Sequence, residues 1–275
     1  MASRVNLEAV VPEEWAKALE WVKLNRPLVH TITNFVSASL QAGGTIALGG
    51  SPVMSRWPDE AEELTSSASS LVVNMGTPEK EGITATERAL SACRNIVFDP
   101  VGYGASSSRK ALIDRLLSLT APTVIKGNYG EIGLLVGGEG GVRGVDSAAK
   151  NYPPVSRMKN FARRTGILIC ATGELDIFCD SKTALSVSGG SGLMRKISGG
   201  GCLLGSLMGA LIPVEPVPGA TAASVILKLA GERAEKRASG PGSFVVHLLD
   251  ELAKVTPEDL KGQGWRINKL WEEEK

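Results

Sequence analysis

Short apolar runs alternate with segments of helical periodicity along most of the chain. The runs are typical of buried strands, which we predict at Ile46–Leu48, Ser70–Asn74, Ile96–Phe98, Thr123–Ile125 and Ile167–Ala171. The periodic segments predict helices at Pro12–Leu24, Asp59–Ser67, Thr84–Cys93, Ser108–Leu119, Tyr129–Val136, Val155–Arg164, Ala220–Ser239 and Ser243–Val255. Strands that alternate with helices favour an α/β fold with a mostly parallel sheet and helices on both faces.

Other segments do not fit this alternation. Pro27–Thr33 is either a strand end or the start of a helix that runs to about Ala42. Asp176–Cys179 and Ala184–Ser188 predict a hairpin, and Gly137–Gly144 predicts a flexible connection.

Polar and glycine-rich loops follow most of the predicted strands. They are Gly49–Met54, Asn74–Thr77, Asp99–Gly104, Lys126–Glu131, Thr172–Asp176 and Ser198–Cys202. In parallel sheets, ligands bind beyond the carboxyl ends of the strands. We therefore expect these loops to converge on one site.

The Ser198–Cys202 loop contains three consecutive glycines and precedes the apolar run Leu203–Leu211, which predicts a buried helix. The free N–H groups at the start of such a helix favour an anion, most often phosphate. A thiol there is expected to have a lowered pKa. A tight loop with Cys202 as a small buried hydrophobe fits this stretch equally well.

Composition excludes several classes of protein. The chain has 275 residues, of which 43% are hydrophobic, and its 30 Lys and Arg nearly balance 29 Asp and Glu. No basic stripe, transmembrane-length run or signal-peptide core is present, so we expect a cytoplasmic protein that binds neither nucleic acid nor membranes. The spacing of the four cysteines and two histidines disfavours zinc and disulfides. No linker divides the chain, so one domain over 1–275 is expected, with a charged, solvated helix at 257–275.

Single residues in the loops have two interpretations each. Asp99 and Glu131 are either magnesium ligands or a turn carboxylate and a helix-start charge. Lys126 either holds a phosphate or is solvated, and Thr172 either faces a nucleotide or ends a strand. Met54 packs on an apolar ligand or on the core. Taken singly, the structural interpretation is favoured for both carboxylates.

Known nucleotide-binding motifs are missing or incomplete in the sequence. There is no G-x-x-x-x-G-K-[ST]. Gly102-Tyr103-Gly104 follows a predicted strand, but Ser107 stands at the third glycine of a dinucleotide fingerprint. Both P-loop and dinucleotide-binding proteins are therefore disfavoured.

Taken together, the motifs resemble the hydroxyethylthiazole kinase family in order from about residue 27 to 252. They are His30–Asn34, Ala47–Met54, Asn74–Thr77, Asp99–Gly102, Lys126–Asn128 with Glu131-Ile132, Gly144–Ser147, Thr172-Gly173 with Asp176, Gly199–Cys202 and Gly240–Phe244. The resemblance implies the three-layer α/β/α fold of the ribokinase-like superfamily. It also implies ATP- and Mg²⁺-dependent phosphorylation of 4-methyl-5-(2-hydroxyethyl)thiazole in thiamine salvage, by a homotrimer with active sites between subunits.

The resemblance also implies roles for individual residues. Cys202 matches the catalytic cysteine, the base for the substrate hydroxyl. Gly199, Gly200 and Gly201 match the loop over the transferred phosphoryl group, and Gly199 also lies near the thiazole. The other matches are Met54 and Asn34 in the thiazole pocket, Lys126 and Thr172 at the nucleotide, and Asp99 and Glu131 at magnesium.

The sequence departs from the family pattern at several places. Lys126 replaces a common arginine, Gly200 a common threonine and Gly44 a common asparagine. The connection from Ala89 to Ile96 is shorter than usual, and Pro257–Lys275 lies outside the resemblance. The first three departures bear on substrate and turnover rather than on the fold.

Two other functions fit the same fold. One is a different kinase of the superfamily, such as one that phosphorylates a hydroxymethylpyrimidine; Ser51–Met54 and Ile32–Asn34 argue against it. The other is a non-catalytic regulator that binds thiazole or nucleotide. The presence of Cys202, Asp99 and Glu131 together argues against that regulator.

Overall fold

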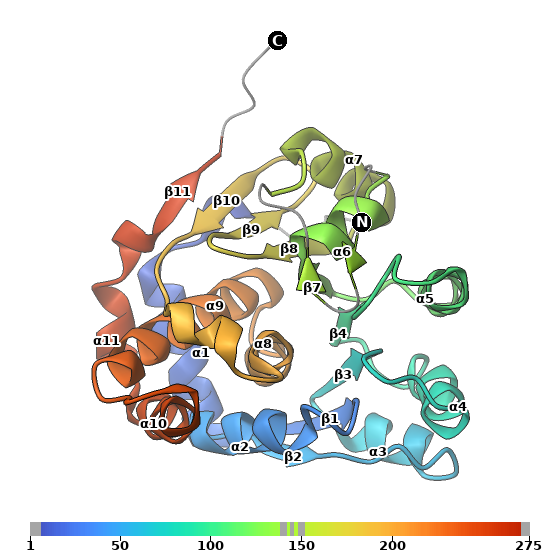
Figure 1. Cartoon of the computed structure of the whole chain (residues 1–275), viewed down its shortest axis with the longest axis horizontal. Helices are drawn as coiled ribbons and strands as arrows, with labels where there is room; N and C mark the ends of the chain where they lie inside the picture. Colours follow the sequence, from blue (N-terminus) through green and yellow to red (C-terminus); the bar gives the residue numbers. More distant parts are fainter. Residues whose placement is uncertain (1–6, 138–141, 144–145, 148–151, 271–275) are drawn as a thin grey trace.

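A central sheet of nine strands organises the fold (Figure 1). The computed structural model describes residues 7–137, 142–143, 146–147 and 152–270. The strands, in spatial order, are β11 (Ile267–Lys269), β10 (Ala184–Val187), β9 (Asp176–Cys179), β8 (Leu168–Thr172), β5 (Val124–Asn128), β4 (Ile96–Asp99), β3 (Ser70–Asn74), β1 (Leu28–Ile32) and β2 (Ser51–Val53).

The six strands from β8 to β2 run parallel, whereas β9, β10 and β11 pair antiparallel at the other edge. Strands that are buried on both faces are typical of a parallel sheet between helices. All five residues of β3 are buried, which fits its position at the centre of the parallel region. The carboxyl ends of β1, β3, β4, β5 and β8 consequently meet at one edge.

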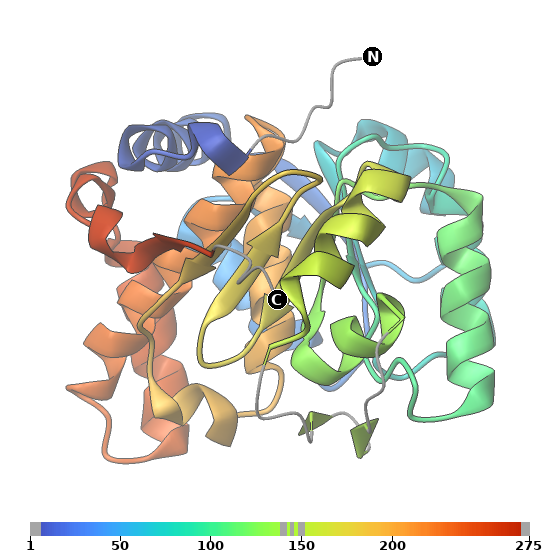
Figure 2. The same ribbon diagram turned by 90° about the horizontal axis from the view of Figure 1, so that it is seen from above.

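Helices cover both faces of this sheet (Figure 2). One layer comprises α1 (Pro12–Asn25), α2 (Ala38–Leu48), α8 (Gly200–Leu211), α9 (Pro216–Glu235), α10 (Pro241–Lys254) and α11 (Pro257–Lys261). The other comprises α3 (Ala61–Ser67), α4 (Lys80–Ala89), α5 (Ser107–Leu119), α6 (Tyr129–Leu135) and α7 (Val155–Thr165). The predicted α/β/α architecture is confirmed.

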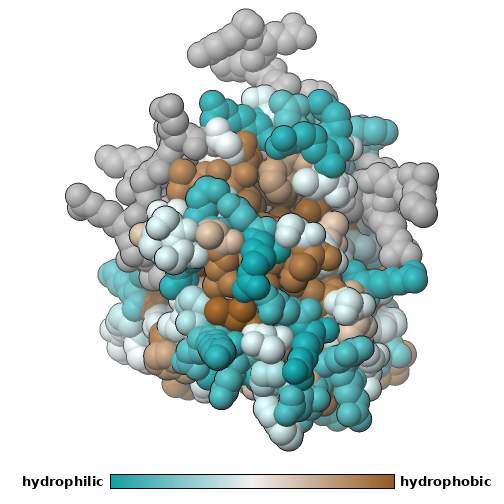
Figure 3. Space-filling view, turned by 90° about the vertical axis from the view of Figure 1, so that its right-hand side faces the viewer, coloured by the Kyte–Doolittle hydropathy of each residue, from teal (hydrophilic) through white to brown (hydrophobic). Residues whose placement is uncertain are grey.

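Alternation along the strands divides the core into two apolar clusters. On β3, Val72 faces the cluster under α8 and α9, while Leu71 and Val73 face the cluster under α3 to α7. Successive side chains of a strand point to opposite faces, so each strand contributes to both clusters. The outer face over α4 and α5 shows apolar side chains between polar ones (Figure 3).

Short elements complete the fold. They are the 3₁₀ helices η1 (Leu7–Ala9), η2 (Gly192–Lys196) and η3 (Gly264–Arg266), and a small hairpin of β6 (Val142–Arg143) and β7 (Asp146–Ser147). The predicted flexible connection Gly137–Gly144 lies largely outside the described residues. Along the parts of the chain that the structure describes, no helix has the length and apolar character needed to cross a membrane.

Several element boundaries were predicted wrongly. Ile46–Leu48 is the last turn of α2, not a strand; Gly49, at φ 110°, ends that helix. An apolar triplet alone cannot distinguish a buried strand from a helix turn. The Gly49–Met54 loop contains edge strand β2, and α4 begins at Lys80 rather than Thr84. Pro27–Thr33 proves to be a strand, since it contains β1.

The end of the chain is also different from the solvated helix that we expected. The described part of 257–275 contains α11, η3 and strand β11, which pairs with β10. Leu260 and Arg266 are buried there. Among the described residues of this segment, Arg266 is the one strongly buried charge, and it pairs with Glu232 inside the fold. The charged composition of the segment therefore did not reveal its packing.

Candidate active site

A hydrogen-bonded chain of buried polar side chains joins the carboxyl ends of three parallel strands. Asn34, after β1, donates through Nδ2 to Asn74 Oδ1 at 2.7 Å. Asn74, at the end of β3, donates in turn to Asp99 Oδ2 at 2.8 Å. All three residues are at most 4% exposed. Buried polar groups require such partners, so this chain fixes the side chains at the rim of the sheet.

Lys126 links this chain to the glycine-rich loop. From β5 its Nζ lies 2.7 Å from Asp99 Oδ2 and 2.9 Å from the carbonyl oxygen of Gly201. Burial alone would lower the pKa of Lys126, but the charges of Asp99 and Cys202 raise it above its usual value. The ammonium therefore stays charged at the point where β4, β5 and α8 meet.

Helix α8 begins within the predicted loop. Gly199 occupies the position before the helix with φ 79°, and a Cβ there would lie 2.8 Å from Ser37 Cβ, so glycine fits best. A Cβ at Gly200 would lie 2.8 Å from the carbonyl oxygen of Met194 in η2. The backbone of η2 therefore passes so close to Gly200 that it leaves little room for the side chain of the threonine common in the family. Gly201 is exposed, and nothing lies within 4 Å of a Cβ placed on it.

Cys202 lies in the first turn of α8 and is half-buried. Burial and the neighbouring carboxylate of Asp99 raise the pKa of its thiol, while Lys126 and hydrogen bonds with Asn74 and Ser37 lower it. The net direction is upward. The expected lowering by the helix N-terminus is therefore wrong for the free protein, because burial and Asp99 outweigh it.

Glu131 belongs to the first turn of α6. Its carboxylate accepts the N–H of Gly102 at 2.7 Å and that of Asn128 at 2.8 Å, and Asn128 caps the same helix in return. Burial and Asp99 raise the pKa of Glu131 to about 7, although both backbone hydrogen bonds and Lys126 oppose the rise. The helix-start interpretation of Glu131 is thus confirmed, and its side chain also holds the loop after β4.

Asp99 is the residue best suited to a magnesium ion. It is 1% exposed, and its Oδ1 has no hydrogen-bond partner among the described residues. Burial raises its pKa, opposed by Lys126 and Asn74. The described residues contain no cluster of three or more His, Cys, Asp or Glu able to hold a metal. Mg²⁺ typically uses one or two carboxylates plus phosphates and waters, so the residues fit an ion held jointly with a nucleotide.

Thr172 and Met54 lie on opposite sides of this group of residues, at β8 and after β2. Thr172 ends β8, and its hydroxyl donates to the carbonyl oxygen of Gly127 at 3.1 Å. Met54 follows edge strand β2 and is half-buried, outside both apolar cores. The hydrogen-bonded chain thus brings together Asn34, Asp99, Lys126 and the glycine loop, whereas Met54 is separated from Asn74 by β1.

Two residues at the site were missed by sequence reasoning. Asn74 connects Asn34 to Asp99; its loop was expected at the site and belongs to the family motifs, but the residue itself was given no role. Arg109, on α5, donates to the carbonyl oxygens of Met75, Gly76 and Val101, the last two at 2.8 and 3.0 Å. It thereby joins the loops after β3 and β4. An arginine that shares its helix with Lys110 and Arg115 gives no sequence signal of this role.

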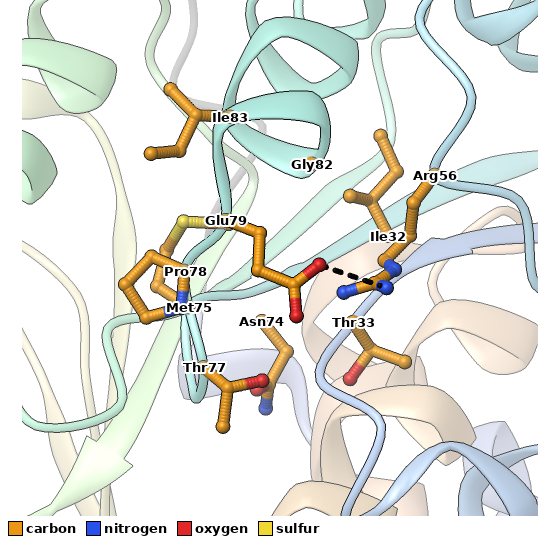
Figure 4. A pocket seen from close by; sticks show the side chains of 10 residues that line it. All are labelled: Ile32, Thr33, Arg56, Asn74, Met75, Thr77, Pro78, Glu79, Gly82 and Ile83. Carbon is orange, nitrogen blue, oxygen red and sulfur yellow. Dashed lines mark ion pairs between the residues drawn. The ribbon is translucent and has the colours of Figure 1, made fainter.

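A small cavity adjoins the chain of polar residues (Figure 4). Its volume is about 10 Å³, the space of about one water. The lining includes Thr33, Asn74 and Met75, with Arg56 paired to Glu79 at 3.2 Å across it. Thr33 Oγ1 has no hydrogen-bond partner in the described part of the chain. Polar groups therefore line this end of the site.

Both the sequence and the fold of this chain match those of known proteins. The hydroxyethylthiazole kinase family profile matches residues 19–258. The hydroxyethylthiazole kinase of Methanosphaerula palustris is 40% identical over 88% of this chain and 94% of its own length, and that of Pyrococcus furiosus is 38% identical over 89% and 94%. The solved structure of a hydroxyethylthiazole kinase protein from Pyrococcus horikoshii OT3 matches with a TM-score of 0.82 and 31% identity, over 94% of this chain and 99% of that one.

A more distant solved structure shares the fold alone. The pyridoxal kinase of Staphylococcus aureus has a TM-score of 0.55 and 15% identity over 75% of this chain and 88% of its own. The profile covers the rim residues from Asn34 to Cys202. The chain therefore belongs to the hydroxyethylthiazole kinase family.

Proposed function

We propose that this protein transfers the γ-phosphoryl group of ATP to the primary hydroxyl of 4-methyl-5-(2-hydroxyethyl)thiazole, a step of thiamine salvage. The observation that carries the proposal is the buried Asp99–Lys126 pair at the first turn of α8, where Lys126 also bonds the carbonyl of Gly201. Phosphoryl transfer needs charge neutralisation and positioning more than covalent chemistry. A fixed cation beside free helix N–H groups supplies both.

The nucleotide is assigned to the side of the rim nearer β5 and β8. Lys126 and Thr172 would contact the nucleotide. The N–H groups of Gly200 and Gly201 would donate hydrogen bonds to the phosphoryl group during its transfer to the alcohol. The exposed backbone of Gly201 leaves room for this approach. As lysine, residue 126 offers one charged point rather than the planar fork of arginine.

Magnesium is assigned to the carboxylates. Asp99 would hold it through the unpartnered Oδ1, and Glu131 through water, since backbone N–H groups already occupy both of its oxygens. When bound, the ion neutralises charge on the ATP phosphates. Asn74 and Lys126 keep the Asp99 carboxylate in place.

The acceptor alcohol is assigned to the end of the rim at β1 and β2, between Asn34, Met54 and Gly199. Cys202, in the first turn of α8 and hydrogen-bonded with Asn74 and Ser37, would as a thiolate accept the hydroxyl proton as the oxygen attacks phosphorus. Its raised pKa means that the thiol, not the thiolate, prevails before substrates bind. The thiol must therefore first lose its proton to solvent, and nearby Lys126 favours the thiolate that then takes up the hydroxyl proton.

A homotrimer with active sites between subunits is part of the proposal. Large apolar side chains beside the acceptor end are exposed in the single chain: Phe35 by 68%, Val36 by 54% and Trp57 by 60%. They flank Asn34 and Met54 in sequence. Exposed apolar groups beside a site favour coverage by another chain, and a second subunit would close the pocket around Met54.

An ADP-release assay tests this function. Purified protein with MgATP is offered a panel of hydroxylated heterocycles, including the thiazole alcohol and a hydroxymethylpyrimidine. We expect ADP release with the thiazole alcohol alone. Release with the pyrimidine instead would favour the alternative kinase, and no release with any alcohol would favour the non-catalytic regulator.

A further inference from the structure

The C-terminal segment after α11 contains a buried arginine, Arg266, that pairs with a carboxylate on α9. The family profile ends at residue 258, so η3 and β11 lie beyond it. Arg266, at the end of η3, is 1% exposed. Its guanidinium makes two bonds to the Glu232 carboxylate on α9, at 2.8 and 2.7 Å. A bidentate pair of this kind fixes geometry as well as charge.

The same arginine fixes the turn that follows β10. Its NH1 donates to the carbonyl oxygen of Ser188 at 3.3 Å, and its own carbonyl accepts the Ser188 N–H at 2.9 Å. Gly189 has φ +99°, and a Cβ on it would lie 1.9 Å from Arg266 NH1. The N–H of Gly190 donates to Glu232 Oε1 at 2.8 Å. The turn and the Arg266–Glu232 pair therefore form one rigid unit.

This turn is connected through η2 to the loop Gly199–Gly201, which is assigned to the phosphoryl group. Gly190 is followed by η2, whose Met194 carbonyl lies against Gly200 at the start of α8. A shift of the turn is thus passed through η2 to the backbone assigned to the phosphoryl group.

A second path leads from the same turn to the nucleotide side. Lys228, on α9, donates to the Gly189 carbonyl at 3.3 Å and lies 3.4 Å from the Asp176 carboxylate. Asp176 accepts the hydroxyl of Ser224 at 2.6 Å and the N–H of Gly173 at 3.3 Å. Gly173 adjoins Thr172, so both paths end at backbone assigned to ATP.

We propose that Arg266 is a positioning residue for nucleotide binding: through the Ser188–Gly190 turn it sets the start of α8 and the Thr172–Gly173 turn. The proposal rests on the proposed function for its choice of ligand. It predicts that loss of the guanidinium weakens nucleotide binding more than acceptor binding, because both paths end at backbone assigned to ATP, whereas only the first ends beside Gly199 and neither reaches Asn34 or Met54.

Calorimetric titration of the full-length protein with MgADP tests the proposal. In Arg266→Met we expect the dissociation constant to rise roughly 3- to 30-fold, the range for coupling through a packed network. Arg266→Lys keeps the charge without the fork and should recover part of the loss. The KM for the thiazole alcohol should rise less than the MgADP dissociation constant in both.

Arg233→Met is the matched control. Arg233 ties the preceding helix α11 to α9, through Asp259 at 2.6 Å, but among the described residues it makes no hydrogen bond or ion pair with the turn. It should lower the melting temperature and leave the MgADP dissociation constant unchanged. Amide hydrogen exchange over 186–200 should rise in Arg266→Met only.

Two results would overturn the role of Arg266: wild-type MgADP affinity in Arg266→Met, or an equal loss in both arginine variants, which indicates general destabilisation. The proposed function is judged separately. If wild-type protein binds MgADP but does not phosphorylate the thiazole alcohol, that function fails, while the comparison of the two variants still decides the role of Arg266.

Discussion

At the scale of single residues, the site depends on charges held close together away from water. Asp99, Lys126 and Glu131 are each at most 3% exposed, and Lys126 contacts Asp99 directly. Removing one partner of a buried pair leaves the other uncompensated, at a cost of several kcal/mol. The opposite charges of Asp99 and Lys126 therefore stabilise each other. A single substitution in this group is expected to lower the stability of the fold as well as the reaction rate.

Cys202 is the residue whose role is most sharply testable. If it accepts the hydroxyl proton, Cys202→Ala should lose roughly 10²-fold or more in kcat, at the lower end of general-base contributions, with little change in ATP binding. Cys202→Asp should retain turnover, since a carboxylate accepts a proton without forming a thiolate. If the γ-phosphate takes the proton instead, Cys202→Ala will turn over almost as wild type and Cys202→Asp will be slower.

The raised pKa of Glu131 predicts a pH dependence of stability. Its folded value of about 7 exceeds the ordinary 4.5, so between these values the folded chain holds a proton that the unfolded chain has lost. The free energy of unfolding must then fall as pH rises through this window. Denaturation of nucleotide-free protein at pH 5 and pH 8 should show a smaller fall in Glu131→Gln.

Glu258→Gln, at a side chain 79% exposed on α11, serves as the control and should keep the wild-type difference between the two pH values. Equal differences in Glu131→Gln and wild type would show that Glu131 does not titrate in this window.

The strand ends predicted from the sequence indicated that the loops of the site meet at one edge, whereas the roles of the individual residues came from the resemblance to the family. Asp99, Lys126 and Asn34 follow short apolar strands, and parallel strands bring such positions to one edge. The thiol pKa was predicted in the wrong direction because burial and the distance to Asp99 depend on packing. Arg109 was missed because its partners are backbone carbonyls of distant loops, which no local pattern reveals.

At the scale of elements, the contact of α2 with α8 holds the glycine-rich loop against the rim. A Cβ on Gly44 in α2 would lie 2.2 Å from Leu203 Cδ1, one residue after Cys202. The common asparagine of the family would not fit here without movement of Leu203. Gly44 is thus matched to the close approach of the two helices.

Gly44→Ala tests this approach. Overpacking of a buried contact costs about 1–3 kcal/mol, and the gain in helix propensity recovers at most about 1 kcal/mol. We expect a net loss of stability in urea denaturation. Gly43→Ala, one residue earlier, places its Cβ 3.4 Å from Leu249 Cδ1 and should be neutral or slightly stabilising. Similar losses in both would contradict the packing argument.

Element types were predictable where periodicity was long or apolar runs were flanked by turns. Strand β3 and the β9–β10 hairpin were predicted almost to the residue. The end of α2 and edge strand β2 were not, because Ile46–Leu48 is too short to distinguish the two periods. Strand β11 escaped prediction because it is short, polar and stabilised by pairing with β10.

At the scale of the whole molecule, the proposal of a shared site rests on exposed apolar side chains at the assigned acceptor end. Met54, directly after edge strand β2, is half-buried, and Phe35 and Trp57, which lie near Asn34 and Met54 in the sequence, are exposed. A neighbouring subunit is needed to cover them if the pocket is to exclude water. The assembly and the activity should therefore be linked.

Light scattering with size-exclusion chromatography tests this link. We expect a trimer at assay concentration, and Met54→Ala should raise the KM for the thiazole alcohol while changing the melting temperature little. A fully active monomer would contradict the shared site. A large loss of stability in Met54→Ala with unchanged KM would assign Met54 to the core of its own chain.

The most direct test of the central claim is mass-spectrometric detection of the product. With MgATP and the thiazole alcohol, wild-type protein should form the phosphate ester and ADP in equal amounts. Asp99→Asn, if folded by circular dichroism, should lose roughly 10²-fold or more in rate, as expected for removal of transition-state charge stabilisation. ADP without the ester, or ester formation by Asp99→Asn at the wild-type rate, would contradict the assignment of the Asp99–Lys126 rim as the phosphoryl-transfer site.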